Sequence, residues 1–217
     1  MDFERARFNM IEQQIRPWEV LDPMVLDALG VIRREDYVPE RYRTLAFVDM
    51  EIPLGEGEVM MSPKVEARLV QALGLSRTDR VLEIGTGSGY LTALLAYLSG
   101  HVTSVERIEA FSREAARRLG AGGIGNVTLE TGDGANGWPA HGPYDAIILT
   151  GSLPVLPDTF AATLAPEGRL VAIVGDAPAM TARLVTRVGD AAFQTDNLFE
   201  TVIAPLRNAR QPARFVF

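Results

Sequence analysis

Residues 81–90 read Val81-Leu82-Glu83-Ile84-Gly85-Thr86-Gly87-Ser88-Gly89-Tyr90, an apolar run that ends in a glycine-rich turn. This pattern is typical of a buried strand that passes through a tight turn into a helix. Glycines let the backbone turn sharply and approach a ligand closely, while the first N–H groups of the following helix point toward that ligand. The segment therefore predicts a strand-turn-helix unit that binds a nucleotide-like cofactor.

The spacing of the glycines narrows the identity of the cofactor. A dinucleotide fingerprint reads G-x-G-x-x-G, but Tyr90 stands where the third glycine would fall, and Gly89 comes one residue too early. A nicotinamide-dependent dehydrogenase is therefore disfavoured. The form acidic-x-G-x-G-x-G, with Glu83 before Gly85, resembles motif I of S-adenosylmethionine-dependent methyltransferases. That resemblance implies S-adenosyl-L-methionine as cofactor and S-adenosyl-L-homocysteine as product.

Composition excludes several classes of protein. The chain has 217 residues, 47% hydrophobic and 23% charged, and this ordinary globular usage predicts one domain over residues 1–217. The formal net charge of −7 disfavours nucleic acid as a partner, and the apolar runs are too short to span a membrane. Because cysteine is absent, disulfides and thiolate metal sites are excluded, and we expect no metal. An acidic start without signal-peptide features predicts a cytoplasmic location.

Short β-rich runs alternate with helical ones after residue 80, which predicts a parallel sheet with helices on both faces. We expect a doubly wound, Rossmann-like α/β fold with a seven-stranded, mostly parallel sheet, in which the last two strands form an antiparallel edge. The predicted strands are residues 80–84, 101–106, 126–133, 144–150, 168–175, 181–188 and 197–206. The predicted helices between them are residues 90–98, 108–119 and 156–164, the last ended by the proline and glycine of residues 165–168.

The first part of the chain has a different pattern. Residues 1–75 predict a helical amino-terminal extension, and residues 76–217 the Rossmann-like core that binds the cofactor. Phe8, Ile11 and Ile15 would share one helix face. Two helix starts carry a capping residue followed by proline, at Asp22-Pro23 and at Ser62-Pro63.

Ligands of such sheets bind outside the carboxyl ends of the strands, so residues at strand ends are candidate contacts. Glu106 could accept hydrogen bonds from the ribose hydroxyls, or be a solvated strand-end charge. Asp133 could accept from an adenine amino group, or belong to a plain Asp-Gly turn. Asp145 could serve only to cap a strand start, and Thr150 would lie beside the transferred methyl group. The predicted cofactor-contacting residues are Glu83, Gly85, Thr86, Gly87, Ser88, Gly89, Tyr90, Leu91, Glu106, Arg107, Gly132, Asp133, Gly134 and Thr150.

A more specific resemblance extends over nearly the whole chain. It rests on Arg7-x-x-Met10-Ile11-x-x-Gln14, Val25-Leu26-x-Ala28, Arg34-Glu35-x-Tyr37-Val38-Pro39, Ile52-Pro53-Leu54-Gly55-x-Gly57 and residues 154–175. With these pieces the chain resembles the protein-L-isoaspartate O-methyltransferase family. The resemblance implies an enzyme that methylates the free carboxylate of isoaspartyl residues in damaged proteins.

The sequence departs from that family at one sensitive place. The family reads Thr-Ile-Ser-x-Pro before a helix, and its active-site serine corresponds to Met61 here, with Ser62 under the variable position. A serine hydroxyl can donate a hydrogen bond to a carboxylate, whereas a thioether donates nothing. Ser62 would be a poor substitute catalytic residue, because its side chain is expected to cap a helix. Glu58 replaces a family glutamine, and Lys64 follows the proline. The carboxyl-terminal residues 199–217 fit the family only loosely.

Three functional hypotheses follow. The first is an isoaspartyl carboxyl methyltransferase that tolerates Met61. The second is a methyltransferase of the same fold with another small-molecule or protein acceptor, and the third is a module that binds the cofactor without catalysis. A carboxylate nucleophile is ionised at neutral pH and needs no strong base. The two histidines agree with this, because His101 lies in a predicted strand and His141 in a loop, with no triad around them.

Overall fold

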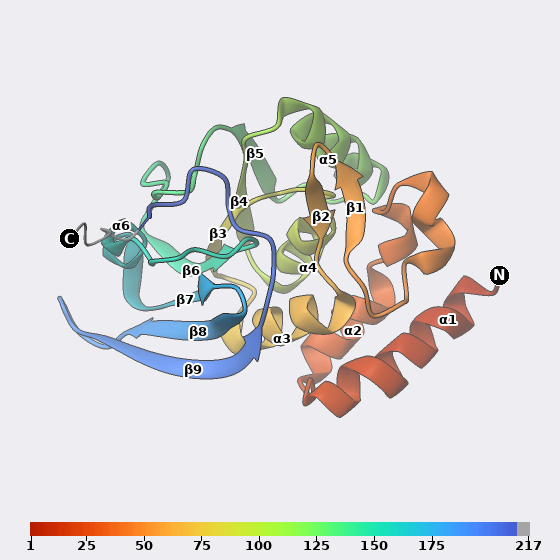
Figure 1. Cartoon of the computed structure of the whole chain (residues 1–217), viewed down its shortest axis with the longest axis horizontal. Coiled ribbons are helices and arrows are strands. Elements are labelled where there is room, and N and C mark those ends of the chain that lie inside the picture. The colour runs from red at the N-terminus through yellow and green to blue at the C-terminus, as the bar shows by residue number, and fades with distance from the viewer. Residues whose placement is uncertain (212–217) are drawn as a thin grey trace.

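The computed structural model describes residues 1–211, and its centre is a seven-stranded sheet in the order β5-β4-β3-β6-β7-β8-β9 (Figure 1). The first five of these strands run parallel, and β8 and β9 add an antiparallel edge. This confirms the predicted doubly wound, Rossmann-like fold. The strands are β3 (Arg80–Ile84), β4 (His101–Glu106), β5 (Val127–Thr131), β6 (Tyr144–Leu149), β7 (Leu164–Asp176), β8 (Ala179–Arg187) and β9 (Phe193–Thr201).

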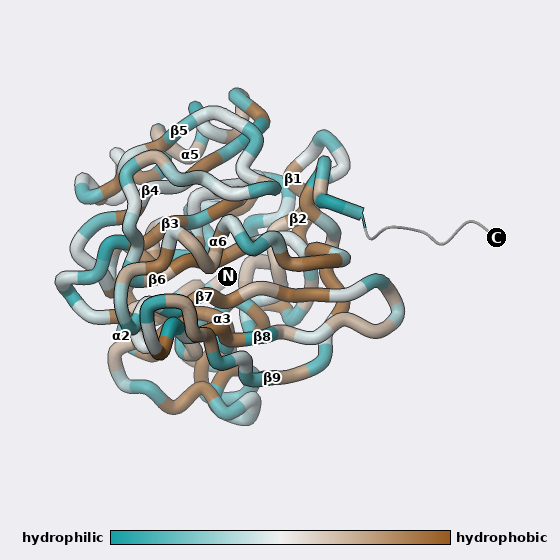
Figure 2. Tube along the Cα trace, turned by 90° about the vertical axis from the view of Figure 1, so that its left-hand side faces the viewer, coloured by the Kyte–Doolittle hydropathy of each residue, from teal (hydrophilic) through white to brown (hydrophobic). Residues whose placement is uncertain are grey.

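The central strands carry buried apolar side chains on both faces, because helices or loops cover each face of the sheet. Val81 and Ile148 belong to the core on one face, and Leu82 and Ile147 to the core on the other. Figure 2 shows the hydrophobic stretches concentrated on these inner strands. The chain order reverses at β3, between β4 and β6, and a ligand crevice is expected at such a point.

Helices from two parts of the chain cover the sheet. The first face carries the amino-terminal segment together with α3 and α4, whereas α6 lies on the second face (Figure 1). α3 is amphipathic, and its Val65, Leu69 and Leu73 are buried at four-residue spacing. The helices of the core are α3 (Pro63–Leu73), α4 (Tyr90–Leu98), α5 (Glu109–Ala121) and α6 (Asp158–Ala162).

The amino-terminal segment is helical over most of its length. Asp22 caps α2 as predicted, with its carboxylate accepting from the Met24 N–H at 2.8 Å. The predicted apolar face is wrong at Phe8, which is 62% exposed, whereas Met10 and Ile15 are buried. The helical elements are α1 (Phe3–Met10), a π-helix (Ile11–Ile15), α2 (Pro23–Val31) and three 3-10 turns (Arg16–Trp18, Arg34–Asp36 and Glu40–Leu45).

Two predictions for this segment need correction. Residues 1–75 are not helical throughout, because β1 (Ile52–Gly55) and β2 (Glu58–Met60) form an antiparallel hairpin around the turn of Gly55, Glu56 and Gly57. Positive φ angles at all three turn residues allow this tight reversal. Ser62 stands at the amino-terminal end of α3, but its side chain makes no capping hydrogen bond.

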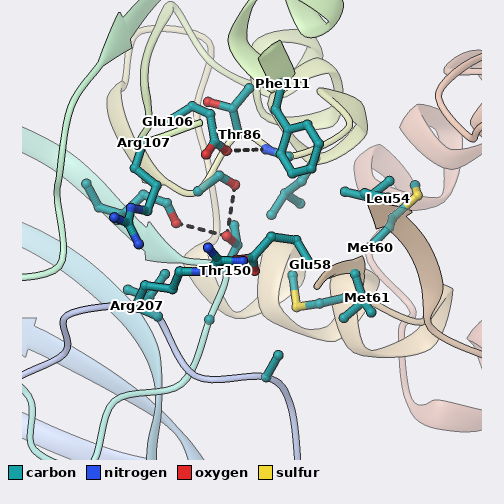
Figure 3. A pocket seen from close by; sticks show the side chains of 18 of the residues that line it. Leu54, Glu58, Met60, Met61, Thr86, Glu106, Arg107, Phe111, Thr150 and Arg207 are labelled. Carbon is teal, nitrogen blue, oxygen red and sulfur yellow. Dashed lines mark hydrogen bonds and ion pairs between the residues drawn. The ribbon is translucent and has the colours of Figure 1, made fainter. Parts of the chain in front are cut away.

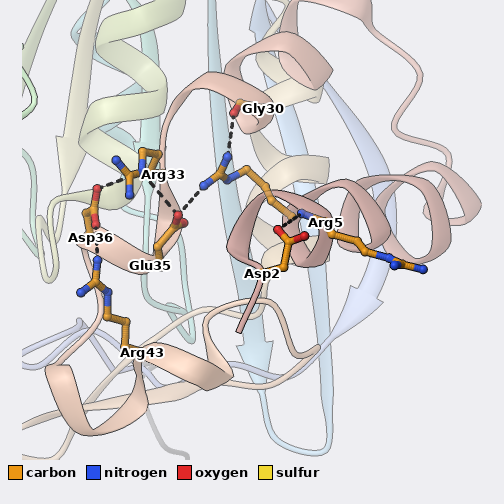
Figure 4. Close-up of polar contacts among 8 residues, drawn as sticks. Asp2, Arg5, Gly30, Arg33, Glu35, Asp36 and Arg43 are labelled. Carbon is orange, nitrogen blue, oxygen red and sulfur yellow. Dashed lines mark hydrogen bonds and ion pairs between the residues drawn. The ribbon is translucent and has the colours of Figure 1, made fainter.

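Ion pairs and hydrogen bonds of charged side chains connect the parts of the amino-terminal segment (Figure 4). Arg7 pairs with the buried carboxylate of Glu35, to which Arg33 Nε also lies within 3.4 Å. Asp36 accepts from Arg43 at 3.1 Å. At the start of the chain, Asp2 caps α1 by accepting from the Arg5 N–H at 3.0 Å. These contacts link α1, the turn at residues 34–36 and the turn at residues 40–45.

Boundaries at the carboxyl-terminal side also differ from the predictions. α6 ends at Ala162, and β7 begins at Leu164, four residues before its predicted start. The proline and glycine of residues 165–168 form a bulge inside β7, because Leu164 pairs with Tyr144 and Arg169 with Ala146. β9 covers Phe193–Thr201 rather than residues 197–206. Of the segment 199–217, residues 212–217 lie outside the described residues.

Candidate functional site

A pocket opens at the carboxyl ends of β3, β4 and β6, at the switch point of the sheet (Figure 3). It encloses about 930 Å³, including its open mouth. Residues from four segments line one side, and we call these segments, 84–91, 105–111, 132–135 and 150–151, the cofactor half. The other side is lined by the acceptor half, which we define as residues 51–61 and 203–207. Twelve of the predicted site residues line it, namely Met61, Gly85, Thr86, Gly87, Ser88, Leu91, Glu106, Arg107, Gly132, Asp133, Gly134 and Thr150.

The glycine turn after β3 is held by hydrogen bonds from its neighbours. The Gly85 N–H donates to the Val105 carbonyl at 2.8 Å, and the Thr150 hydroxyl lies near the carbonyls of Ile84 and Gly85 at 2.9 and 2.8 Å. Gly85 has a φ of +98°, and a Cβ atom there would overlap Thr150 Oγ1. A side chain at Gly85 is thus excluded both by the backbone conformation and by the position of Thr150.

Two residues of the motif support the turn from outside the pocket. Gly89 is the residue just before α4 and has a φ of +83°, and an added Cβ would come within 3.1 Å of Ala115 Cβ. Tyr90 is buried in the core, where its ring lies 4.8 Å from the Arg34 guanidinium and 5.7 Å from the Tyr37 ring. Neither residue lines the pocket, so the prediction that they contact the cofactor is not supported by their positions.

Glu106, at the end of β4, aims its carboxylate at the backbone of the glycine turn. Oε2 accepts from the Gly87 N–H at 2.9 Å, and Oε1 accepts from the Ile108 N–H at 2.8 Å. The residue is 6% exposed and lines the pocket. Each oxygen keeps a further lone pair, so the carboxylate can still accept hydrogen bonds from a ligand's hydroxyl groups.

Glu83 lies beneath the turn and does not line the pocket. Its Oε2 accepts from the hydroxyls of Thr92 at 2.5 Å and Ser104 at 2.6 Å, whereas Oε1 has no partner among the described residues. Complete burial raises the pKa of Glu83 to about 8, despite the hydrogen bonds from both hydroxyls. Direct contact between Glu83 and a ligand is therefore not supported, and its carboxyl group supports β4 and α4 instead.

Asp133 stands at the edge of the cofactor half. It accepts from the Ala135 N–H at 3.1 Å and from Asn208 Nδ2 at 2.6 Å, and the bond from Asn208 lowers its pKa. The glycines on either side have a packing role. A Cβ atom on Gly132 would overlap the Trp138 ring, and one on Gly134 would lie 2.7 Å from Ile84 Cδ1.

The acceptor half has an apolar wall and one ion pair. Met61 is only 5% exposed and lines the pocket, as do Leu54 and Met60 (Figure 3). Arg207, in the segment after β9, reaches Glu58 of β2, with Nε 2.5 Å from Oε1. Ser62 does not line the pocket, so its position does not support it as a substitute for the family's serine.

A buried ion pair lies behind Met61. Arg34 pairs with Glu66 of α3, and its Nη2 donates to the Met61 carbonyl at 2.6 Å. Both side chains are almost completely buried, and Glu66 lines the pocket. Burial raises the pKa of Glu66 to about 7, although the charge of Arg34 opposes the rise. The guanidinium thereby fixes the backbone at the position of the missing serine.

Several chemistry-bearing residues lie outside the pocket. His101 Nε2 is 2.9 Å from Thr128 Oγ1, and His141 Nε2 is 2.5 Å from Glu130 Oε1. Asp145 accepts from the Arg80 N–H at 2.8 Å, at the opposite ends of the strands. Residues 1–211 contain no cluster of side chains suited to hold a metal ion. No helix within that range has the length and apolar character required to traverse a bilayer.

The sequence did not identify several pocket residues, because they belong to segments that only the folded chain brings together. Phe111 of α5 carries no motif, and residues 203–206 were predicted to belong to the last strand, which in the structure ends at Thr201. Glu66 resembles any charged residue on an amphipathic helix. The pocket residues outside the predicted set are Glu51, Leu54, Glu58, Val59, Met60, Glu66, Ile84, Val105, Phe111, Ala135, Gly151, Ile203, Ala204, Pro205, Leu206 and Arg207.

A family model and curated proteins that match this chain all point to the same family. Residues 5–211 match the model of the family described as protein-L-isoaspartate(D-aspartate) O-methyltransferase (PCMT). Protein-L-isoaspartate O-methyltransferase 1 of Rhodopseudomonas palustris (strain HaA2) is 42% identical over 94% of this chain and 84% of its own length. Protein-L-isoaspartate O-methyltransferase 2 of Pelobacter propionicus is 39% identical over 95% of this chain and 92% of its own.

A solved Plasmodium falciparum protein, in complex with S-adenosyl-L-homocysteine, shares the fold. It superimposes with a TM-score of 0.79 over 95% of this chain and 99% of its own, at 19% identity. The family match covers the amino-terminal segment, the hairpin and the pocket alike. The chain therefore belongs to the protein-L-isoaspartate(D-aspartate) O-methyltransferase family.

Proposed function

We propose that this protein transfers a methyl group from S-adenosyl-L-methionine to the free carboxylate of isoaspartyl residues in damaged proteins and peptides. The observation that carries the proposal is the family match over residues 5–211, which includes both halves of the pocket. The chain spans at least 84% of the two curated relatives named above. A cytoplasmic location, which the cysteine-free composition favours, is part of the same proposal.

The cofactor half fits S-adenosyl-L-methionine. Its glycine turn exposes backbone at Gly85 and Gly87, and Glu106 offers carboxylate oxygens with free lone pairs for ribose hydroxyls. Asp133 and the apolar Phe111 line the same half, and can accept from and pack against the adenine. When bound, the sulfonium supplies an electrophilic methyl group with a neutral thioether as leaving group.

The protein's own contribution to this reaction is orientation and exclusion of water. The acceptor carboxylate is ionised at neutral pH, so no side chain has to remove a proton from it. This agrees with the positions of His101 and His141, which both lie outside the pocket lining. Met61, Met60 and Leu54 give the acceptor half an apolar wall that excludes water from the reacting atoms.

A second candidate function has a specific observation in its favour. Met61 provides no hydrogen-bond donor, and Glu58 adds a negative charge where the family pattern has a neutral glutamine. Both changes would weaken the binding of an anionic acceptor. The alternative is a methyltransferase of this fold that acts on a different small molecule or protein.

The test is transfer of a labelled methyl group from S-adenosyl-L-methionine to an isoaspartyl peptide, its aspartyl twin and a metabolite fraction, for wild type and Met61→Ser. Base-labile label on the isoaspartyl peptide alone, with wild-type protein, supports the proposal. Label in the metabolite fraction alone favours the second candidate function. Cofactor binding without transfer to any acceptor would indicate a non-catalytic module.

A further inference from the structure

The acceptor half carries more acidic than basic side chains. Glu51 and Glu58 line it, and Glu66 reaches the same pocket from α3. Among the described lining residues, only Arg107 and Arg207 are cations, and Arg107 belongs to the cofactor half next to Glu106. An anionic acceptor that enters this half therefore meets several carboxylates and a single guanidinium.

Arg207 is placed to meet such an acceptor. Its Nε lies 2.5 Å from Glu58 Oε1, and its Nη2 donates to the Glu56 carbonyl. Within residues 1–211, Nη1 makes no hydrogen bond or ion pair. The side chain of Arg207 is 42% exposed, and that of Glu58 is 28% exposed. The guanidinium is thus fixed on one edge by the β1–β2 hairpin and open on another.

A carboxylate and a guanidinium match in geometry, because parallel N–H groups can donate to both carboxylate oxygens. Met61 leaves the acceptor half without the hydroxyl donor of the family pattern, and Glu58 repels an anion. Lys64 does not compensate, because it pairs with Asp49 at 2.6 Å and does not line the pocket. Arg207 is then the group that can attract a carboxylate here.

We propose that Arg207 binds the acceptor carboxylate, and that Glu58 both positions this guanidinium and competes with the acceptor for it. The inference rests on the proposed function and names the residue that recognises its substrate. The Arg207–Glu58 pair sets the acceptor specificity of this chain in place of the serine hydroxyl. The affinity for anionic acceptors therefore depends on whether Arg207 pairs with the acceptor carboxylate or with Glu58.

The experiment measures KM and kcat for an isoaspartyl peptide and KM for S-adenosyl-L-methionine in Arg207→Met, Arg207→Lys and Glu58→Gln. Arg207→Met should raise the peptide KM by about tenfold or more, while the cofactor KM stays within about twofold. Arg207→Lys should recover part of the loss. Glu58→Gln removes the competing charge and should lower the peptide KM severalfold, whereas a merely structural ion pair would give the opposite change.

Arg117→Met is the matched control, because Arg117 pairs with Glu114 on the surface of α5 and lies outside the pocket lining. Arg117→Met should leave the peptide KM, the cofactor KM and kcat unchanged. If wild type is active and Arg207→Met keeps the wild-type peptide KM, the assignment of Arg207 is wrong while the proposed function stands.

If the wild type transfers no methyl group to the isoaspartyl peptide, the proposed function fails. Calorimetric binding of that peptide to protein saturated with S-adenosyl-L-homocysteine then decides the assignment. Binding that weakens in Arg207→Met supports Arg207 as the carboxylate receptor. Absent binding, or binding that is equal in both proteins, overturns it.

Discussion

The backbone N–H of Gly87 donates to Oε2 of Glu106 at 2.9 Å, which joins the glycine turn after β3 to the end of the neighbouring strand β4. Glu106 thereby shapes the turn and also faces the pocket. The same carboxylate accepts from the Ile108 N–H through its other oxygen. One side chain thus connects the conformation of the cofactor-binding loop with the proposed ribose contact.

Glu106→Gln should weaken the binding of S-adenosyl-L-methionine by about 10- to 100-fold, because hydrogen bonds to a charged acceptor contribute about 1.5–3 kcal/mol. The amide would also turn a donor toward one of the two backbone N–H groups. Isothermal titration calorimetry measures the change. Glu109→Gln, an exposed residue on α5, is the control and should bind as the wild type does. Equal affinity of Glu106→Gln and wild type would exclude the proposed role of Glu106.

Gly85→Ala should destabilise the protein by about 1–3 kcal/mol, because a left-handed backbone conformation is strained for alanine. The methyl group would also displace Thr150 from its position beside the turn, so cofactor affinity should fall as well. Urea unfolding and calorimetry measure both effects. Gly120→Ala is the control, since nothing lies within 4 Å of its added Cβ at the end of α5. A Gly85→Ala protein as stable as Gly120→Ala would contradict this account of the turn.

Glu83→Gln should reduce the pH dependence of stability. Burial raises the pKa of Glu83 from 4.5 to about 8, so the folded protein keeps a proton that the unfolded chain has released in this range. The free energy of unfolding of the wild type therefore falls as the pH rises from about 4.5 to about 8, and this contribution disappears in the variant. Urea unfolding at several pH values tests it, with the exposed Glu109→Gln as control. If the free energies of unfolding of wild type and Glu83→Gln changed with pH in parallel, the prediction would be refuted.

Arg34→Met should cost about 3–5 kcal/mol of stability near pH 8, because the buried carboxyl group of Glu66 then either stays charged without a partner or has to take up a proton. Replacing both residues by methionine should restore most of the loss. A double-mutant cycle from urea unfolding measures the coupling. The exposed pair of Arg113 and Glu109 is the comparison, and its coupling should be about 0–1 kcal/mol. Additive effects of Arg34→Met and Glu66→Met would show that the buried pair is not coupled.

The sequence predicted the core of the fold well because its signals are local. β3 and β4 have the predicted bounds, since each is a short β-rich run that ends at a turn or a charge. The β1–β2 hairpin was missed because its strands are very short, and the Gly55-Glu56-Gly57 turn has no long alternating pattern beside it. The start of β7 was missed because a proline and a glycine, which usually end elements, form a bulge here.

The candidate site was predictable only where it depends on the glycine motif and on strand ends. Gly85, Gly87 and Glu106 line the pocket because the carboxyl ends of parallel strands meet at one edge. The contact between Arg207 and Glu58 could not be predicted, because it joins two segments that are distant in the sequence. The capping bond predicted for Ser62 was wrong. Serine favours helix caps in general, but the side chain of Ser62 makes no capping hydrogen bond in this structure.

The central claim is that the acceptor is the isoaspartyl carboxylate. The most direct measurement is tandem mass spectrometry of an isoaspartyl peptide and its aspartyl twin after incubation with the protein and S-adenosyl-L-methionine. The account predicts one added methyl group on the isoaspartyl residue, removed by mild base, and an unchanged aspartyl peptide. An unmodified isoaspartyl peptide, in the presence of protein that binds the cofactor, would contradict the claim.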